Sequence, residues 1–305
     1  MMGELFMEYS YSDFSNNEMD LKLIELVLEG NGYALEELIK KYQNFIYNIA
    51  FRMVLSPYDA EDITQEILIK IITKLETFKG KSSFKTWVGK ITVNHVLNMK
   101  KKWLEERYKE KELYEHELDN IRIGELHGYS QPEKQILYEE ARLGCLAGML
   151  LCLSREQRIV YILGELFEVP GEICAEILSI APATYRKHLS RARNDLYQFM
   201  NDKCGLVNPK NSCRCMKKTK GFIEAGWVDP TTMKFYAEHE RKIYECLEIK
   251  DNQLKKIENF SYQNIIQSLP YIDHTISKQI VRGILERVEV KKIFNLGSEK
   301  NERTV

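Results

Sequence analysis

The chain has 305 residues, and its 44 Lys and Arg against 45 Asp and Glu leave a formal net charge of −1. This balance excludes a uniformly basic nucleic-acid coat, so any DNA binding must come from local basic faces. The length predicts more than one small hydrophobic core. No apolar run is long enough to cross a bilayer and the N-terminus lacks a signal pattern, so we expect a cytoplasmic protein without a membrane segment.

Helices are predicted to begin after an acidic N-terminal segment. Residues 1–18 lack hydrophobic periodicity, which predicts a flexible tail. Amphipathic spacing then favours helices over residues 21–29 and 34–53, with Gly30, Asn31 and Gly32 as the break between them. With the segment that follows, they give a first helical domain over residues 19–102.

The helix that begins near Asp59 has two contrasting faces. Its Ile and Leu residues recur at helical spacing and are predicted to enter the core. The opposite face carries Asp62, Gln65, Glu66 and Ile69 at positions i, i+3, i+4 and i+7. Such a face is either solvated surface or a docking surface for a basic or mixed helical partner.

A Gly-Ser loop at residues 80–83 precedes a basic helix, which Ser82 or Ser83 is placed to cap. No Asp or Glu occurs between Lys85 and Trp103. A cationic, amide-bearing face beside loop aromatics suits single-stranded nucleic acid, which needs phosphate neutralisation and surfaces for unstacked bases. The alternative is a Trp-anchored core helix with a basic surface. The residues concerned are Phe78, Phe84, Lys90, Asn94, Asn98 and Lys101.

Two runs in this region resemble a known family. DAEDITQE, at residues 59–66, and FKGKSSFKTWVGKITVNHVLNMKKK, at residues 78–102, are similar to the second conserved domain of bacterial extracytoplasmic-function (ECF) RNA polymerase sigma factors. In that family the first helix docks on the coiled coil of the polymerase's largest subunit. The loop captures a flipped base of the melted promoter element, and the basic helix holds the opened strand.

The resemblance implies a role for each matching position. Polymerase docking falls to Asp62, Gln65 and Glu66. Contact with melted promoter DNA falls to the loop and the basic helix, at Phe78, Lys79, Ser82, Ser83, Phe84, Lys90, Asn94, Asn98 and Lys101.

Residues 103–132 are dense in charge, have few aligned apolar side chains, and contain Gly124, Gly128 and Pro132. We interpret them as a charged linker. The family resemblance implies that the acidic part, residues 112–119, threads toward the polymerase's active-site and RNA-exit channels, whereas composition alone favours a simple tether equally well.

Residues 133–200 are predicted to form a second helical domain that contains a helix-turn-helix. Ser154 and Gln157 have the spacing of a capping box. Pro170 and Pro182 each open a further helix, and residues 179–181 form the turn. An apolar stripe follows the last helix at Tyr185, Leu189, Ala192 and Leu196. The outward face is then cationic, as in a helix that reads the major groove, although a helical hairpin with a basic outside is the alternative.

SREQR, at residues 154–158, and PGEICAEILSIAPATYRKHLSRARNDL, at residues 170–196, resemble the fourth conserved domain of ECF sigma factors. In that family the last helix binds the distal upstream promoter element. The resemblance implies DNA contact by Ala183, Thr184, Arg186, Lys187, Ser190, Arg191 and Asn194.

Seven cysteines without a secretory pattern indicate a reducing compartment. Three lie in helical patterns and are interpreted as small buried hydrophobic residues, namely Cys145, Cys152 and Cys174.

The connector at residues 201–230 carries three close cysteines, Cys204, Cys213 and Cys215. They could supply three thiolates to zinc, whose closed structural sites take four ligands. The nearest candidates for the fourth are His188, His239 and Cys246. A thiol redox switch is a second interpretation. The simplest is a reduced loop packed on the helix-turn-helix, so we expect no required cofactor and keep zinc as a hypothesis.

Residues 231–297 are predicted to form a helical C-terminal extension. A helix is expected from Asp229 to about residue 257, a second over residues 262–269 and a third over about residues 276–294. No Gly-rich phosphate loop, HExxH motif or Ser-His-Asp set is recognisable there. Protein contact or regulation is the expected role.

The sequence therefore predicts an all-α protein: two small helical DNA- and polymerase-binding domains, a charged linker, a helix-turn-helix in the second domain and a C-terminal helical extension. We expect a non-enzymatic ECF-type sigma factor that binds core RNA polymerase, recognises two upstream elements of double-stranded promoter DNA and helps to melt one to single strands. An anti-sigma or other regulatory protein is a further expected partner. The alternative is a helix-turn-helix adaptor or repressor that contacts polymerase without initiating; an enzyme has no residues in its favour.

Overall fold

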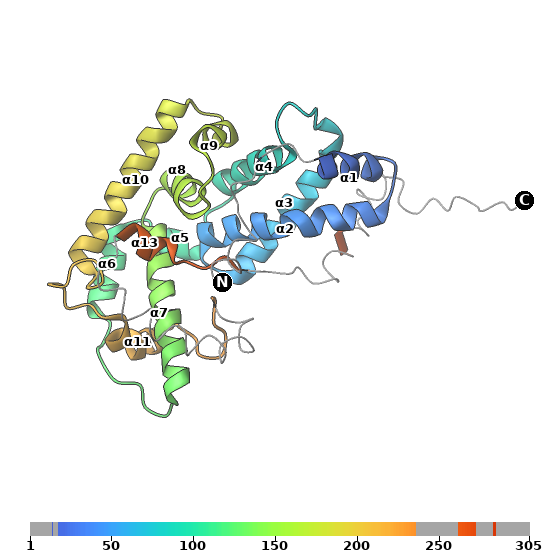
Figure 1. Cartoon of the computed structure of the whole chain (residues 1–305). Coiled ribbons are helices and arrows are strands. Elements are labelled where there is room, and N and C mark those ends of the chain that lie inside the picture. Colours follow the sequence, from blue (N-terminus) through green and yellow to red (C-terminus); the bar gives the residue numbers. More distant parts are fainter. Residues whose placement is uncertain (1–13, 15–17, 236–261, 273–282, 285–305) are drawn as a thin grey trace, which may run out of the picture.

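The computed structural model describes residues 14, 18–235, 262–272 and 283–284. Within these residues every regular element is helical, apart from one isolated bridge between Cys204 and Cys213. Figure 1 shows α1 to α4 at one end and α7, α10 and α11 at the other, with α8 and α9 beside α4 in the middle. None of the described helices combines the length and the apolar character that crossing a bilayer requires. The predicted all-α class is confirmed.

The first half consists of α1 (Glu18–Leu28), α2 (Gly32–Val54), α3 (Pro57–Thr73), the 3-10 turn η1 (Leu75–Thr77) and α4 (Phe84–Asn98). Asn31, Ser56 and Ser83 cap α2, α3 and α4, because each side chain accepts a hydrogen bond from the backbone N–H three residues further on. The apolar faces of α2 and α3 pack together, and Ile46 and Ile67 are fully buried there. Each such burial contributes about 1.5–3 kcal/mol.

The prediction of a flexible N-terminal tail is wrong at Phe14. The Phe14 ring is buried and meets Phe45 of α2 edge to face, with centroids 6.1 Å apart. The Lys85 ammonium lies 4.7 Å from the centroid of the Phe14 ring. Phe14 stands in an acidic segment without hydrophobic periodicity, so no local sequence pattern indicated this contact.

The second half consists of α7 (Gln131–Leu151), α8 (Arg155–Tyr161), the π-helical turn η2 (Ile162–Leu166), α9 (Gly171–Leu178) and α10 (Pro182–Lys203). The predicted capping box of Ser154 and Gln157 is present, and a second one, of Ser130 and Glu133, starts α7. The predicted helix-turn-helix is formed by α9 and α10. Between them Ser179 adopts the left-handed conformation, with φ 55°.

Residues 103–132 are more than the charged linker that was predicted. They form α5 (Trp103–Arg107) and α6 (Lys111–Asn120), which fold onto the second half. Tyr114 of α6 is buried between Phe199 of α10 and Trp227, at centroid distances of 5.8 and 5.2 Å. The prediction failed because five apolar residues that are scattered along this segment reach the core. They are Tyr108, Tyr114, Leu118, Ile121 and Leu126.

A buried ionic cluster joins the two halves. The Glu105 carboxylate of α5 is held by Arg155 and Arg158 of α8, at 2.7 and 3.0 Å. Arg155 also donates to the carbonyl oxygens of Leu97 and Met99 at the end of α4, at 3.2 and 2.7 Å. Buried charges are tolerated when they are paired and hydrogen-bonded in this way. The cluster thus fixes α8 against the C-terminal end of α4.

The C-terminal extension contributes α11 (Cys215–Glu224), which packs on α7, and α13 (Tyr262–Gln267), which packs on η2. The helix predicted from Asp229 is wrong over residues 229–235, which are not helical. The Asp229 carboxylate instead accepts the backbone N–H and the hydroxyl of Thr231, at 2.8 and 2.6 Å, an arrangement that favours a turn. The rest of that predicted helix lies outside the described residues. So does the third, except for residues 283–284, which are helical.

The segment after α13 touches both halves. The carbonyl oxygens of Pro270 and Ile272 accept hydrogen bonds from Arg52 and Asn48 of α2, each at 2.7 Å. The Ser268 hydroxyl accepts one from Arg142 of α7 at 2.8 Å. Residues 268–272 therefore tie the extension to α2 and α7 together.

Candidate nucleic-acid interface

Helix α3 presents the predicted docking face to solvent. Asp62 and Glu66 are exposed and Gln65 is half-buried, whereas Ile63 and Ile67 of the same helix are buried. Ser56, which caps α3, and the helical period of the sequence together determine which side chains of α3 are buried and which are exposed. The exposure fits a docking surface, and the docking role of these three polar residues stays a prediction.

The loop before α4 differs from the prediction in its aromatic part. Phe84 is buried and packs against Tyr42, Phe78 and Trp87, at centroid distances of 5.2, 5.2 and 5.4 Å. Ser83 is buried as the cap of α4. In this arrangement Phe84 and Ser83 stabilise the loop from inside. A base that bound the loop would contact its more exposed residues. The more accessible predicted residues are Phe78, Lys79 and Ser82.

The predicted DNA face of α4 is partly covered by α9. Lys90 pairs with Glu176 of α9 at 2.9 Å. Gly89 lies so close to Ile177 of α9 that a Cβ at position 89 would come within 3.0 Å of its Cδ1. Farther along the chain the predicted Asn94, Asn98 and Lys101 are exposed. The structure therefore divides the predicted face into a covered start and an open end.

A groove of about 570 Å³ lies between α3 and α4. Asn94 and Asn98 line it, and so do four lysines that the sequence analysis did not assign to DNA: Lys70, Lys74, Lys100 and Lys102. His95 also lines the groove; its burial and the charge of Lys70 lower the pKa of His95, which favours the neutral imidazole at pH 7. Lysines and amides along one groove suit a single nucleic-acid strand. The four-residue spacing of Lys70 and Lys74 is the sequence pattern from which their place along one groove could have been predicted.

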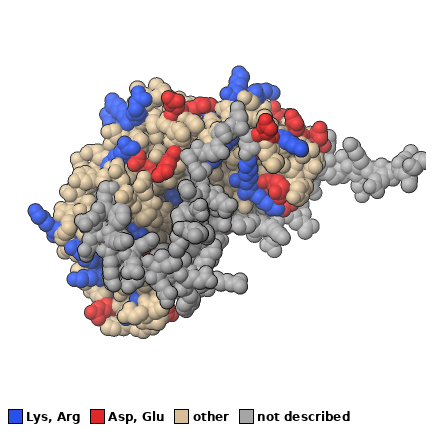
Figure 2. Space-filling view, in the orientation of Figure 1, with Lys and Arg blue, Asp and Glu red and all other residues tan. Residues whose placement is uncertain are grey.

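The recognition helix α10 is arranged as predicted. Its stripe of Tyr185, Leu189, Ala192 and Leu196 is buried. All seven residues assigned to DNA are exposed: Ala183, Thr184, Arg186, Lys187, Ser190, Arg191 and Asn194. Figure 2 shows Lys and Arg in separate groups with Asp and Glu between them, one group lying where Figure 1 places the start of α10. The basic surface is local, in keeping with the near-zero net charge.

The three connector cysteines are close together, but their predicted fourth partner is not among them. His188 lies 16 residues before Cys204 along α10, which corresponds to roughly 24 Å. His239 and Cys246 lie outside the described residues. Burial raises the pKa of Cys215 to about 12 and raises the pKa of Cys204 and Cys213, which keeps all three as thiols. A reactive redox thiolate is not favoured in such surroundings.

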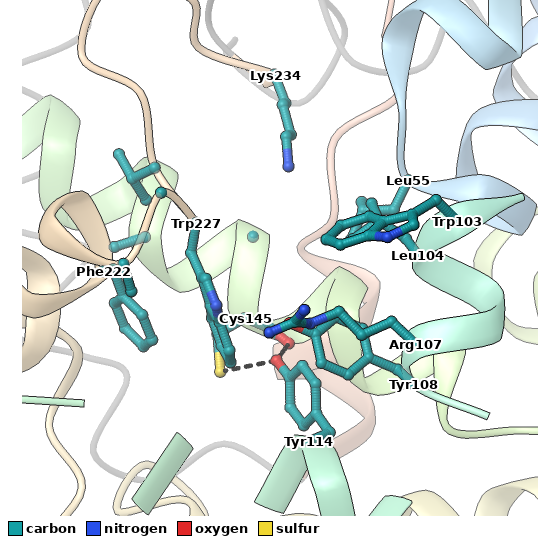
Figure 3. Close-up of a pocket in the computed structure, with 16 residues that line it drawn as sticks. Leu55, Trp103, Leu104, Arg107, Tyr108, Tyr114, Cys145, Phe222, Trp227 and Lys234 are labelled. Carbon is teal, nitrogen blue, oxygen red and sulfur yellow. Dashed lines mark hydrogen bonds between the residues drawn. The ribbon is translucent and has the colours of Figure 1, made fainter. Parts of the chain in front are cut away.

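A cavity of about 280 Å³ lies where α5, α7 and the segment after α11 meet (Figure 3). Trp103, Tyr108 and Trp227 line it, and Lys234 points toward it from the extension. Trp227 also stacks on Phe222 of α11, with centroids 5.2 Å apart. The aromatic packing makes the first part of the extension continuous with the second half of the molecule.

Two regions of the chain match models of known domain families. Residues 38–103 match Sigma-70 region 2, and residues 143–196 match Sigma-70, region 4. The first contains α3, the loop and α4, and the second contains the helix-turn-helix. The molecule is thus a helical DNA-binding protein of the sigma-70 class, with an extension beyond both matches.

Similar whole proteins narrow the class. The ECF RNA polymerase sigma-E factor of Escherichia coli (strain K12) is 31% identical over 178 residues, covering 57% of this chain and 90% of that protein. The ECF RNA polymerase sigma-E factor of Haemophilus influenzae is 29% identical over 178 residues, covering 57% and 91%. A solved structure of CnrH in complex with the cytosolic domain of CnrY shows 16% identity and a TM-score of 0.43, covering 60% of this chain and 98% of that chain. The chain belongs to the ECF RNA polymerase sigma factors, and it is a promoter-recognising sigma factor.

Proposed function

We propose that this sigma factor docks on core RNA polymerase through α3, reads an upstream promoter element with α10, and holds opened DNA in the groove between α3 and α4. The groove carries the proposal, because a repressor needs a recognition helix but no channel for a single strand. Lys70, Lys74 and Lys100 would neutralise phosphates, and Asn94 and Asn98 offer amides to unpaired bases. The fourth lysine of the groove, Lys102, is paired with Asp59 at 2.9 Å. The protein acts beside polymerase in the cytoplasm and contributes specificity rather than catalysis.

Transcription in vitro tests this proposal. Full-length protein is added to core RNA polymerase on promoter DNA whose start site has been mapped in cells. We expect a start-site-specific transcript that neither component gives alone. DNA binding without such a transcript would favour the adaptor or repressor instead.

Charge reversal on α3 tests docking. Asp62→Lys with Glu66→Lys should weaken polymerase binding at least tenfold, a loss of about 1.4 kcal/mol. Both side chains are exposed, so the fold should stay intact. The matched control reverses Glu25 and Glu29, which are exposed at the same spacing near the end of α1. Affinity is measured by titration with labelled core polymerase, and equal losses in both double variants would remove α3 as the docking surface.

Substitution in α10 tests promoter recognition. Arg186→Ala or Lys187→Ala should lower promoter affinity by roughly fivefold to a hundredfold, since a bidentate base contact is worth about 1–3 kcal/mol. A salt series separates a base contact from a phosphate contact, because only loss of the latter reduces the salt slope. Gln198→Ala, at an exposed position farther along α10, is the control. Unchanged binding by both basic-residue variants would contradict the assignment.

A further inference from the structure

Four cysteines converge on one small cavity between α7, α10 and α11. Cys145 comes from α7, Cys204 follows the last residue of α10, Cys213 forms a backbone bridge with Cys204, and Cys215 begins α11. All four line a cavity of about 10 Å³, close to the space that one water molecule occupies. Cys145, interpreted from sequence as an ordinary core residue, thus stands where a fourth ligand was missing.

Hydrogen-bond donors face two of these sulfurs. The Tyr114 hydroxyl lies 3.6 Å from Cys145 Sγ, as Figure 3 shows, and also donates to the Cys145 carbonyl oxygen at 2.9 Å. The backbone N–H groups of Leu206 and Val207 lie near the Cys204 side chain and counter part of the effect of burial on its pKa, although the Val207 N–H donates to the Cys204 carbonyl oxygen, at 3.3 Å. Donors of this kind stabilise metal-bound thiolates and fix their orientation.

Cationic side chains also lie near the cavity and would partly balance the charge of thiolates bound to a metal ion. Arg142 lines the cavity, and no Asp or Glu of the described chain does. Arg214 lies between Cys213 and Cys215 in the sequence, and Lys218 is a buried residue of α11 three positions after Cys215. Four thiolates around one divalent ion carry a net charge of −2. Arg214 and Lys218 offset part of this charge, whereas Arg142 is already paired with Glu139.

The surrounding segment packs on α7 but has little regular structure of its own. Between the end of α10 and Phe235, α11 is the one helix, and it has 10 residues. Small units with so little regular structure are commonly fastened by a structural metal. One ion bonded to Cys145, Cys204, Cys213 and Cys215 would join α11 to both α7 and α10.

A disulfide is the competing interpretation. The described cysteines are free thiols, and as their side chains are placed no three potential ligands of the described chain are grouped so that they could hold a metal ion. Rotation between staggered rotamers would move each sulfur without moving the backbone. A disulfide would use two sulfurs and leave the other two, with their donors and cations, without a role. A metal ion uses all four.

We propose that Cys145, Cys204, Cys213 and Cys215 bind one zinc ion as four thiolates. The site is structural, since four protein ligands leave no open position on a tetrahedral ion. Each thiol gives up its proton on binding, and no change of oxidation state is involved. The zinc fastens the extension to the helix-turn-helix half of the sigma factor.

Metal content and cobalt spectra test the proposal on the full chain. Protein purified under reducing conditions with zinc in the medium should contain one zinc per chain. Replacing zinc by Co²⁺ should give intense thiolate-to-cobalt charge-transfer bands and the visible bands of a tetrahedral ion, with an intensity that reports four thiolates. Absence of zinc and of these bands, or an intact mass lower by two hydrogen atoms, which reveals a disulfide, would overturn it.

Variants assign the ligands. Cys145→Ala and Cys213→Ala should each lose the zinc, and Cys174→Ala, at a buried cysteine outside the cavity, should keep it. A chelator should lower the melting temperature of the parent and of Cys174→Ala, and leave that of Cys213→Ala unchanged. Circular dichroism checks that each variant is folded, and the cobalt spectrum of the parent decides the question if Cys145→Ala does not fold. Zinc retained in a folded Cys145→Ala would contradict the four-cysteine site.

Discussion

Replacing Glu105 with Ala is expected to lower the free energy of unfolding by about 3–5 kcal/mol, the usual cost of removing one partner from a buried ionic cluster. The Glu105 carboxylate is 2% exposed and bridges Arg155 and Arg158, which are themselves buried. Without Glu105 two guanidinium groups would remain in the interior with no negative charge beside them. Leaving a buried charge unpaired costs more free energy than the loss of the ionic attraction alone.

The effect should reach beyond local stability, because the same arginines connect the halves. Arg155 donates to the last carbonyl oxygens of α4, and Arg158 donates to the carbonyl oxygens of Met53 in α2 and Leu150 in α7. We therefore expect the contact between α8 and the first half to loosen in Glu105→Ala. Urea unfolding followed by circular dichroism and by tryptophan fluorescence measures the loss. Glu106→Ala, at the exposed neighbouring position, is the control; a similar small change in both variants would show that the cluster contributes little.

Low pH should cause part of the same loss of stability that Glu105→Ala causes. Burial acts to raise the pKa of Glu105, but the hydrogen bond from Arg155 and the charge of Arg158 outweigh it and hold that pKa below 4.5. A carboxyl whose folded-state pKa is depressed contributes stability that is fully present above its unfolded value and is lost as pH falls through the folded value. The difference in unfolding free energy between parent and Glu105→Ala should therefore be constant from neutral pH to about pH 5 and shrink below pH 4.5.

Helices α2, α3, α4 and α10 were predictable because their signals are local. Each combines an apolar period with a starting residue that acts through its own side chain or ring, such as Ser56, Ser83 or Pro182. The exposed residues of α10 followed directly from its buried stripe. Where the information lay within a few residues, sequence and structure agree.

The contacts that were missed join residues far apart in sequence. The Lys90–Glu176 pair spans 86 positions, and Lys90 was predicted to contact DNA because nothing near it in the sequence pointed to Glu176. Cys145 fitted the apolar pattern of α7, so nothing near it pointed to Cys204. Residues 103–132 looked like a tether because side chains such as Tyr114 find their partners on α7 and α10. Local sequence patterns predicted most of the helices but could not predict how the helices pack against one another.

The pair between Lys90 and Glu176 bears on promoter opening. In the arrangement described, α9 covers the start of α4, so Lys90 can follow a displaced strand only after α9 moves away. An exposed pair of this kind is worth about 0–1 kcal/mol, which DNA contacts readily exceed. Glu176→Gln should therefore leave opening unchanged or ease it, and it serves as the control for the variant that removes the strand contacts themselves.

Lys90→Ala with Asn94→Ala should spare closed-complex binding and reduce promoter opening by at least tenfold. Unstacking a base costs a few kcal/mol, and contacts made only to open DNA must offset that cost. The test compares transcript yield on fully duplex promoter DNA with that on a template whose downstream element is already mismatched. The mismatched template needs no further melting at that element. Transcript yield from the double variant should therefore fall far more on the duplex template than on the mismatched one. Equal loss on both templates, or none on either, would place this face of α4 in the fold of the domain and leave opening to the groove lysines.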